Sequence, residues 1–338
     1  IQSRCTKCGE RVAGCNIQAK NTLDLNYIAR AENPDLLGET GQAAAVKTNA
    51  EVFDVVPEGV EGYTVHFRDP RQADSPPQEI RCQKVVVAAG SFGSTSLLLK
   101  LKDKGSLPRL SDQLGKNWCG NGDLEGSILN IPGHTNPTIG PTITGAISCR
   151  FPDYEDGFPH GLTIQDGGFP SFFAWYLVGR VPSPSAVIRF FKYLKRAFLR
   201  LLRKKTEQRF GDEIFSVMAD DDYVSHTLVM LGMGRDRSNG VLELNQEGEV
   251  ELRWQMQQGS ELHFQRLRAE MGRIAGALGG KLIDSPLTHF VKVIAVHPLG
   301  GCVMGDSAAT GVVDISGEAF GHPGLYVVDG SSLPSSTG

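Results

Sequence analysis

The stretch VVVAAGSFGSTSLLLKLKDKG, residues 85–105, has the pattern of a strand that turns directly into a helix. Its first five residues are apolar and end a strand that we predict over residues 79–90. The helix follows at once, and Gly105 stands where a glycine commonly ends one. A strand joined to a helix by a tight glycine turn is typical of parallel sheets. The sequence therefore predicts an α/β fold.

The turn of this unit has two interpretations. Gly90 and Gly93 would let a ligand approach the backbone, and the amides of the first helical turn can face phosphate. Many turns between a strand and a helix carry two glycines without any ligand. The stronger dinucleotide fingerprint, Gly-x-Gly-x-x-Gly after a strand, does not occur, and the glycines of residues 119–126 are spaced differently. If a dinucleotide binds, we expect its main pyrophosphate-binding unit upstream of Ile1.

Antiparallel strands are predicted around this unit. Residues 126–168 are rich in glycine, proline and threonine, which favours a region of sheet and loops. Alternating patterns and turn-forming dipeptides predict strands over residues 50–56, 62–69, 225–234 and 240–254. Helices are predicted over residues 20–32 and from Ser260 to Gly279, and a further buried strand over residues 324–330.

Composition limits the class of protein. The chain has 338 residues, 40% of them hydrophobic, which suits a soluble globular protein of one large or two domains. Its formal net charge of -4 gives no reason to expect nucleic acid as a partner. Seven scattered cysteines do not form a disulfide framework and favour a reducing compartment. Neither a signal peptide nor a bilayer-spanning run is evident. Because both ends look cut, we expect a segment of a longer protein.

Three cysteines near the beginning raise the question of a metal site. Cys5, Cys8 and Cys15 partly match the C-x2-C-x2-C-x3-C spacing that holds an iron–sulfur cluster. Arg11 occupies the third position, and Asn16 replaces the proline of that pattern. A cation cannot replace a thiolate ligand, so we expect no intact four-cysteine site and no bound metal. An electron-transfer protein that uses these cysteines stays open as an alternative.

Residues 184–206 form a basic amphipathic segment. Eight lysines and arginines flank one apolar helical face that includes aromatic residues, and no acidic residue interrupts them. Such a helix suits the surface of an anionic membrane. A helix packed on the protein with a solvated basic face is an equal alternative. The expected location is accordingly the cytoplasm or the periphery of a membrane.

Two segments near the end carry candidate chemistry. In AVHPLGGCVMG, residues 295–305, an apolar run stops at His297, and Pro298 and two glycines follow. This is either a turn with an incidental imidazole or a base placed where a flat ligand comes close. In GLYVVDG, Asp329 ends a buried strand, where open α/β sheets bind ligands. An ordinary Asp-Gly turn explains the same residues.

These stretches, in this order, resemble the glucose–methanol–choline (GMC) oxidoreductase family and its cholesterol-oxidase-like branch. The matching sequences are GCNIQAKNTLD, VVVAAGSFGSTSLLL, LGKNWCGNGD, GMGRDRSNGVLEL, HPLGGCVMG and GLYVVDGSSLPSSTG. The resemblance implies a Rossmann-like FAD-binding domain, incomplete and discontinuous, over residues 1–126 and 311–338. It also implies a substrate domain with an antiparallel sheet over residues 127–310. The family pattern begins before Ile1 and continues after Gly338.

The resemblance also implies roles for individual residues. His297 matches the family histidine that takes or orients the hydroxyl proton while a hydride passes from the alcohol to flavin N5. Gln165 occupies the position of a catalytic glutamate of cholesterol oxidases, and Asp166 follows it. Because a neutral amide cannot act as a base, double-bond isomerisation of a sterol is not expected. The implied FAD-binding residues are Val52, Gly90, Ser91, Asn117, Gly120, Asn121, Gly122, Asp329 and Gly330.

The expected reaction is the FAD-dependent oxidation of a lipophilic alcohol, such as a sterol. A family member acting on a small polar alcohol or sugar is the first rival interpretation, although such a substrate would not need the basic amphipathic segment. The second rival is the non-catalytic or electron-transferring protein built on the three cysteines. Oxygen, a quinone and a redox protein all stay open as the electron acceptor.

Overall fold

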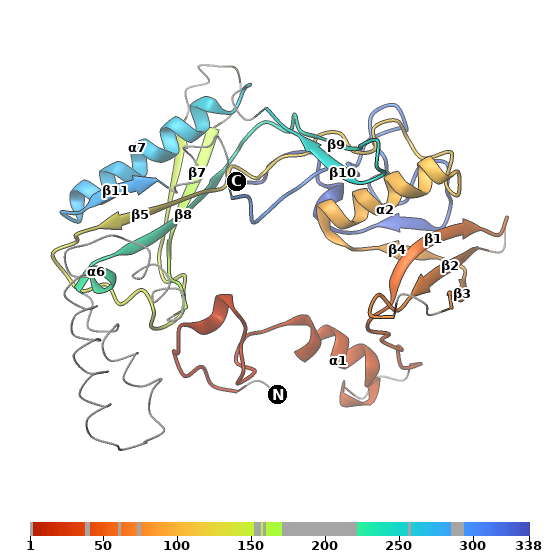
Figure 1. Ribbon diagram of the computed structural model, residues 1–338, viewed down its shortest axis with the longest axis horizontal. Helices are drawn as coiled ribbons and strands as arrows, with labels where there is room; N and C mark the ends of the chain where they lie inside the picture. Colours follow the sequence, from red (N-terminus) through yellow and green to blue (C-terminus); the bar gives the residue numbers. More distant parts are fainter. Residues whose placement is uncertain are drawn as a thin grey trace, which may run out of the picture.

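The computed structural model describes most of the chain and shows two sheet-based parts joined by loops (Figure 1). A five-stranded sheet with the long helix α7 forms one part, and the strand–helix unit around α2 forms the other. The described residues are 3–37, 41–59, 62–72, 76–151, 157, 160–170, 222–255, 258–284 and 294–338.

The strand–helix unit has the predicted parallel arrangement. Strand β4 (Val85–Val87) pairs in parallel with β12 (Leu325–Val327), and helix α2 (Gly90–Lys104) follows β4. Gly105 ends α2 in the left-handed conformation, with φ of 85°. This pairing joins segments that lie more than 200 residues apart in the sequence. The predicted α/β fold is confirmed.

One predicted strand is in fact two. Residues 78–82 form β3 (Gln78–Cys82), which belongs to a different sheet from β4. The chain bends at Gln83, where the polar pair Gln83 and Lys84 separates the two strands. Strand β3 pairs with β2 (Tyr63–Arg68), which pairs in turn with β1 (Glu51–Pro57), all antiparallel.

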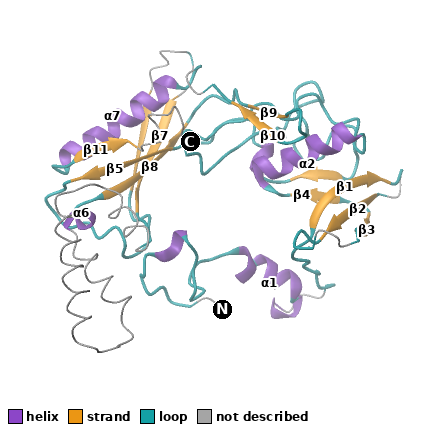
Figure 2. Cartoon of the chain, in the orientation of Figure 1, coloured by secondary structure: helices purple, strands orange, loops and turns teal. Residues whose placement is uncertain are grey.

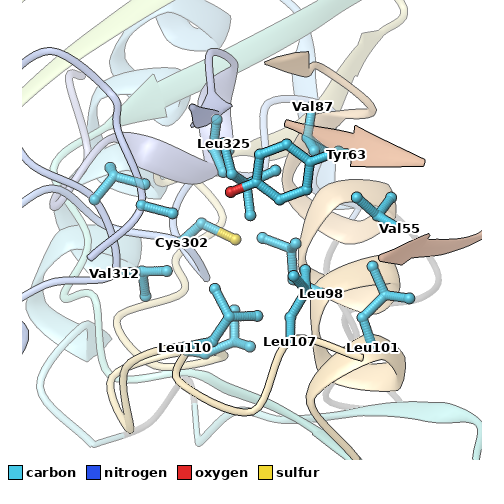
Figure 3. Packing of buried hydrophobic residues seen from close by; sticks show 14 residues of the cluster. Val55, Tyr63, Val87, Leu98, Leu101, Leu107, Leu110, Cys302, Val312 and Leu325 are labelled. Carbon is cyan, nitrogen blue, oxygen red and sulfur yellow. The ribbon is translucent and has the colours of Figure 1, made fainter. Parts of the chain in front are cut away.

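The first hydrophobic core lies between these sheets and α2. Figure 3 shows Tyr63, Leu98 and Leu325 packed together with Cys302. All four side chains are almost fully buried. The Tyr63 hydroxyl donates a hydrogen bond of 2.8 Å to the carbonyl oxygen of Pro323, which attaches the three-stranded sheet to the segment before β12.

The second part is an antiparallel sheet in the order β11-β5-β8-β7-β6. Its strands are β5 (Leu124–Leu129), β6 (Ala146–Phe151), β7 (His160–Gly167), β8 (Leu228–Gly234) and β11 (Lys281–Asp284). Helix α7 (Glu261–Ala277) covers one face, where Leu267 and Met271 pack against Ile128 and Met230 in the second core. The antiparallel sheet that we expected for the substrate domain is therefore present.

Smaller elements complete the described chain, and Figure 2 shows how much of it is loop. Strands β9 (Val241–Leu244) and β10 (Val250–Arg253) form the predicted hairpin. The remaining helices are η1 (Glu10–Val12), η2 (Leu23–Leu25), α1 (Tyr27–Glu32), η3 (Pro34–Leu37), α6 (Asp222–Ser225) and η5 (Gly330–Ser332). The helix predicted over residues 20–32 is interrupted at Asn26, whose backbone is not helical and whose side chain caps α1. In the described part of the chain, no helix is both long and apolar enough to cross a bilayer.

The predicted domain boundaries lie close to the change from one core to the other. Leu124 already belongs to the second core, and Cys302 already belongs to the first. The boundaries at residues 126 and 311 themselves stay a prediction.

Candidate functional site

The centre of the candidate site is a contact between His297 and Asp123. Imidazole Nδ1 of His297 lies 3.0 Å from Oδ1 and 3.2 Å from Oδ2 of Asp123. Asp123 Oδ2 also accepts the backbone N–H groups of Val296 (2.6 Å) and His297 (2.9 Å). The Asp123 side chain is 0% exposed, whereas that of His297 is 44% exposed. One ring nitrogen is thus held by a buried carboxylate while the imidazole keeps an exposed surface.

The His297 segment is fixed by pairing with the loop of residues 117–123. Leu299 and Cys119 exchange two backbone hydrogen bonds of 3.0 Å each. A Cβ on Gly300 would overlap the backbone of Asn117, and one on Gly301 would overlap the Thr95 side chain. Both glycines therefore allow the His297 segment to pack closely against Asn117 and Thr95. That a flat ligand comes close to His297 stays a prediction. Residues 294–296 form no strand, and residues 285–293 lie outside the described residues.

Asp329 and Gly90, both predicted to bind the cofactor, are in direct contact. Asp329 Oδ2 accepts hydrogen bonds from the Gly90 N–H (2.9 Å) and the Ser94 hydroxyl (2.5 Å). Its Oδ1 accepts from the Ser331 N–H (2.8 Å). Although burial opposes ionisation, the hydrogen bonds from Ser331 and Ser94 lower the pKa of Asp329. An ionised carboxylate therefore joins the end of β12 to the start of α2.

Ser91 and Gly330, which were also predicted to bind the cofactor, each form a hydrogen bond with Gly300 of the His297 segment. The Ser91 hydroxyl donates to the carbonyl oxygen of Gly300 at 2.8 Å, and the Gly300 N–H donates to the carbonyl oxygen of Gly330 at 3.0 Å. The fold thus brings Ser91, Gly330 and His297 into one continuous region.

Gly90 is the position best suited to a close approach by a ligand. Its φ is 77°, and a Cβ placed there would meet nothing within 4 Å. Its N–H is already taken by Asp329, and the buried Ser91 hydroxyl is taken by Gly300. A cofactor at this turn would consequently meet the open side of Gly90 rather than the Gly90 N–H or the Ser91 hydroxyl.

The predicted loop residues are anchored mainly to the protein itself. Asn117 and Asn121 both have positive φ values, of 58° and 56°. The Asn121 side chain accepts hydrogen bonds from the backbone N–H groups of Thr337 (2.9 Å) and Gly338 (3.1 Å). A Cβ on Gly122 would overlap His263, which accounts for the glycine there. The loop therefore ties the His297 segment to the last described residues.

A second buried carboxyl group supports the same loop. Asp236, which follows β8, accepts the Gly120 N–H on its Oδ2 at 3.0 Å. Burial raises the pKa of Asp236 to about 6, and the nearby charge of Asp123 acts in the same direction. Of the two carboxyl groups at this loop, Asp123 is the one that holds His297.

The other predicted site residues lie in separate elements. Val52 is in β1, packed against the first core. Gln165 and Asp166 are in β7, and the Asp166 carboxylate accepts hydrogen bonds from Thr144 N (2.7 Å), Thr144 Oγ1 (2.5 Å) and Gly145 N (2.6 Å). Asp166 therefore organises the turn before β6. Among the described residues, no hydrogen bond joins Gln165 or Asp166 to His297, and their catalytic role stays a prediction.

Sequence reasoning missed two acidic residues of this region. The sequence did not indicate that Asp123 contacts His297, because the two residues lie 174 positions apart in the sequence. Glu125 in β5 lies opposite Leu231, which lies opposite Gln165, so the three share one row across the sheet. Burial raises the pKa of Glu125. Alternation along β5 places Glu125 on the face opposite Leu124, and Leu124 packs in the core beneath α7.

The structure adds no specific support for a site at the three cysteines or at the basic segment. Cys5 and Cys8 are exposed free thiols, and Cys15 accepts a hydrogen bond from the Ala19 N–H at 3.1 Å. Within the described ranges, no group of three or more histidine, cysteine or acidic residues is placed to hold a metal ion. The basic segment of residues 184–206 lies outside the described residues.

Comparison with known proteins identifies relatives. Residues 237–338 match the GMC oxidoreductase family. Cholesterol oxidases of Mycobacterium tuberculosis and Acinetobacter baumannii are each 26% identical over 99% of this chain, which covers 56% and 58% of their lengths. A variant of formate oxidase from Aspergillus oryzae has a similar fold, with a TM-score of 0.50 and 15% identity over 84% of this chain and 56% of that one. The chain thus spans a little over half the length of these relatives. The last third of the chain thus matches the GMC oxidoreductase family, and nearly the whole chain is similar to cholesterol oxidases.

Proposed function

We propose that the protein containing this chain oxidises an alcohol with bound FAD, and that His297 accepts the hydroxyl proton. The observation that carries the proposal is the His297 imidazole, which is held on one side by Asp123 and exposed on the other. It lies in the same packed region as the Gly90 turn and the end of β12. The match of residues 237–338 to the GMC oxidoreductase family supports the same reaction.

The residues present fit a flavin cofactor at several points. Gly90 offers open space beside a backbone turn, and Asp329 keeps that turn and the end of β12 together. We assign Gly90, Ser91, Asp329 and Gly330 to the side of the cofactor near β12. The loop of residues 117–122 and the backbone of Val52 would complete the contacts of this chain. When bound, FAD would supply flavin N5 as the acceptor for a hydride from the carbinol carbon.

His297 would accept the hydroxyl proton of the alcohol. A hydride leaves the carbinol carbon readily only if the hydroxyl proton is removed as well. A neutral imidazole can accept that proton, and a positioned general base typically contributes about 10²- to 10⁴-fold to the rate. The exposed surface of His297 leaves an alcohol room to reach the ring.

The substrate that we propose is a lipophilic alcohol, with sterols as one candidate class. The cholesterol oxidases among the relatives support this choice. Gln165 is neutral, and the Asp166 carboxylate is engaged by Thr144 and Gly145. Neither group is free to move a proton along a sterol ring, so we propose oxidation without isomerisation. A small polar alcohol or sugar remains the rival substrate.

Anaerobic reduction of the flavin distinguishes these possibilities. The full-length protein is purified with FAD and mixed without oxygen with cholesterol, a long-chain primary alcohol, or glucose at equal concentration. We expect the flavin absorbance to bleach with the two lipophilic alcohols and to persist with glucose. Bleaching by glucose alone would favour the polar-substrate rival. An iron–sulfur spectrum in place of a flavin spectrum would favour the electron-transfer alternative.

We further propose that residues 184–206 attach the protein to anionic membranes. Eight positive charges among apolar residues at helical spacing in the sequence support this, because surface charge and apolar burial both favour binding. Co-sedimentation with phosphatidylserine vesicles should be strong at low salt and weak at high salt. A variant lacking the segment should remain in solution. Equal sedimentation of both forms would contradict the proposal.

A further inference from the structure

We propose that Asp123 is the positioning residue of the site: it sets the tautomer and the orientation of the His297 imidazole. The inference rests on the proposed role of His297 as proton acceptor and extends it to a second residue. It follows from the hydrogen bonds that the Asp123 side chain accepts, all of which, among the described residues, come from Val296 and His297.

The chemistry of the contact determines where the imidazole carries its proton. An ionised carboxylate has acceptors only, so a ring nitrogen that bonds to it must donate. Nδ1 of His297 therefore carries the hydrogen and donates it to Asp123 at 3.0 Å. In the neutral ring, Nε2 then keeps its lone pair. That is the nitrogen that can accept a proton from an alcohol.

The same carboxylate also fixes the backbone beneath the ring. Its Oδ2 accepts the N–H groups of Val296 and His297, so the residue that carries the imidazole cannot rotate independently of Asp123. The Asp123 backbone is itself held, because its N–H donates to the carbonyl oxygen of Gly120 and Leu124 begins β5. A buried, rigid anion beside the ring would also stabilise the imidazolium that forms when His297 accepts a proton.

A purely structural role for Asp123 predicts something different, and one substitution separates the two. In Asp123→Asn, the amide oxygen can still accept the backbone N–H groups of Val296 and His297. The amide NH₂ then faces Nδ1 of His297, which must accept instead of donate. The neutral imidazole would carry its hydrogen on Nε2 and could no longer take a proton there. The fold is kept while the tautomer is inverted.

The control is Asp314→Asn. Asp314 Oδ1 accepts the backbone N–H groups of Ser316 (2.8 Å) and Glu318 (3.0 Å), as Asp123 does for its own segment. Asp314 lies in the turn before β12 and has no histidine partner among its described hydrogen bonds. The control therefore removes a carboxylate that organises a turn without changing a tautomer.

The primary readout is the tautomer itself. Two-bond ¹H–¹⁵N spectra of ¹⁵N-histidine-labelled protein are recorded at a pH of about 8.5, where an ordinary imidazole is neutral. The His297 signal is the one missing from His297→Gln. We expect Nδ1–H in the wild type and in Asp314→Asn, and Nε2–H in Asp123→Asn. Nε2–H in the wild type would overturn the inference even if Asp123→Asn failed to fold.

The second readout is anaerobic flavin reduction in a single turnover. Asp123→Asn should slow it by about 10²-fold or more, whereas Asp314→Asn should leave it unchanged. If His297→Gln slows reduction but Asp123→Asn does not, the positioning role is wrong while the proposed function stands. If His297→Gln reduces the flavin at the normal rate, the proposed proton acceptor is wrong, and the catalytic effect of Asp123 fails with it.

Discussion

Substituting Asp236 with asparagine should change how the stability of this protein depends on pH. Asp236 is 1% exposed, and its Oδ1 has no hydrogen-bond partner among the described residues. Burial raises its pKa from 3.8 to about 6. In the unfolded chain the carboxyl group is hydrated and keeps its ordinary pKa. The folded state thus holds this proton more tightly than the unfolded state does.

The magnitude follows from the two pKa values. A raised pKa in the folded state means that stability falls as pH rises from about 4 to about 6 and is constant beyond that range. A pKa difference of about 2 corresponds to about 3 kcal/mol in the free energy of unfolding. Asparagine does not titrate, so Asp236→Asn removes this loss. The free energy of unfolding of the variant, relative to that of the wild type, should therefore increase by about 3 kcal/mol between pH 4 and pH 7.

Urea denaturation of both proteins at pH 4, 5, 6 and 7 measures this difference. Asp314→Asn is the control with the opposite sign, because a hydrogen bond from Ser316 lowers the pKa of Asp314. That variant should lose stability relative to the wild type as the pH rises. A free-energy difference between Asp236→Asn and the wild type that stayed constant across the whole pH range would show that Asp236 does not titrate with a raised pKa in the folded protein.

Three further substitutions test other parts of the structure. Asp329→Ala leaves the Gly90 N–H and the Ser94 and Ser331 hydroxyls without an acceptor. Urea denaturation should show a free energy of unfolding lower by about 1–3 kcal/mol, and the variant should retain less FAD after gel filtration. Gly301→Ala should lower the free energy of unfolding by about 1–3 kcal/mol, because φ is 106° and the new Cβ meets Thr95; unchanged stability would contradict the packing described. His322→Leu should raise the melting temperature, because both imidazole nitrogens are buried without a partner among the described residues; a lower one would count against this.

Much of the fold could be predicted because its signals are local. The apolar residues of β4, the helical pattern of α2 and Gly105 lie within 21 consecutive residues. The β9–β10 hairpin likewise depends on a turn within its own sequence. The division between β3 and β4 was missed, because a bend at Gln83 looks the same in sequence as a continuous strand. Which sheet a strand joins depends on partners such as Leu325, far along the chain.

The site was predictable residue by residue but not as a set of contacts. His297 and Asp329 stood out because each ends an apolar run. Asp123 did not, and nothing in the sequence indicated that Gly90 contacts Asp329, since both contacts form only in the folded chain. The glycines after Pro298 pack against Asn117 and Thr95, two neighbours that the sequence did not indicate. A glycine in the sequence indicates that another group packs closely against the backbone, but not whether that group is a ligand or another part of the protein.

Flavin reduction by an alcohol in His297→Gln tests most simply whether His297 accepts the hydroxyl proton. The full-length variant is loaded with FAD, mixed anaerobically with a lipophilic alcohol that reduces the wild type, and followed by stopped-flow absorbance over a single turnover. We expect normal FAD binding and a normal flavin spectrum, with reduction slowed by about 10²-fold or more. Reduction within a few-fold of the wild-type rate would mean that His297 is not the proton acceptor and is only part of a turn.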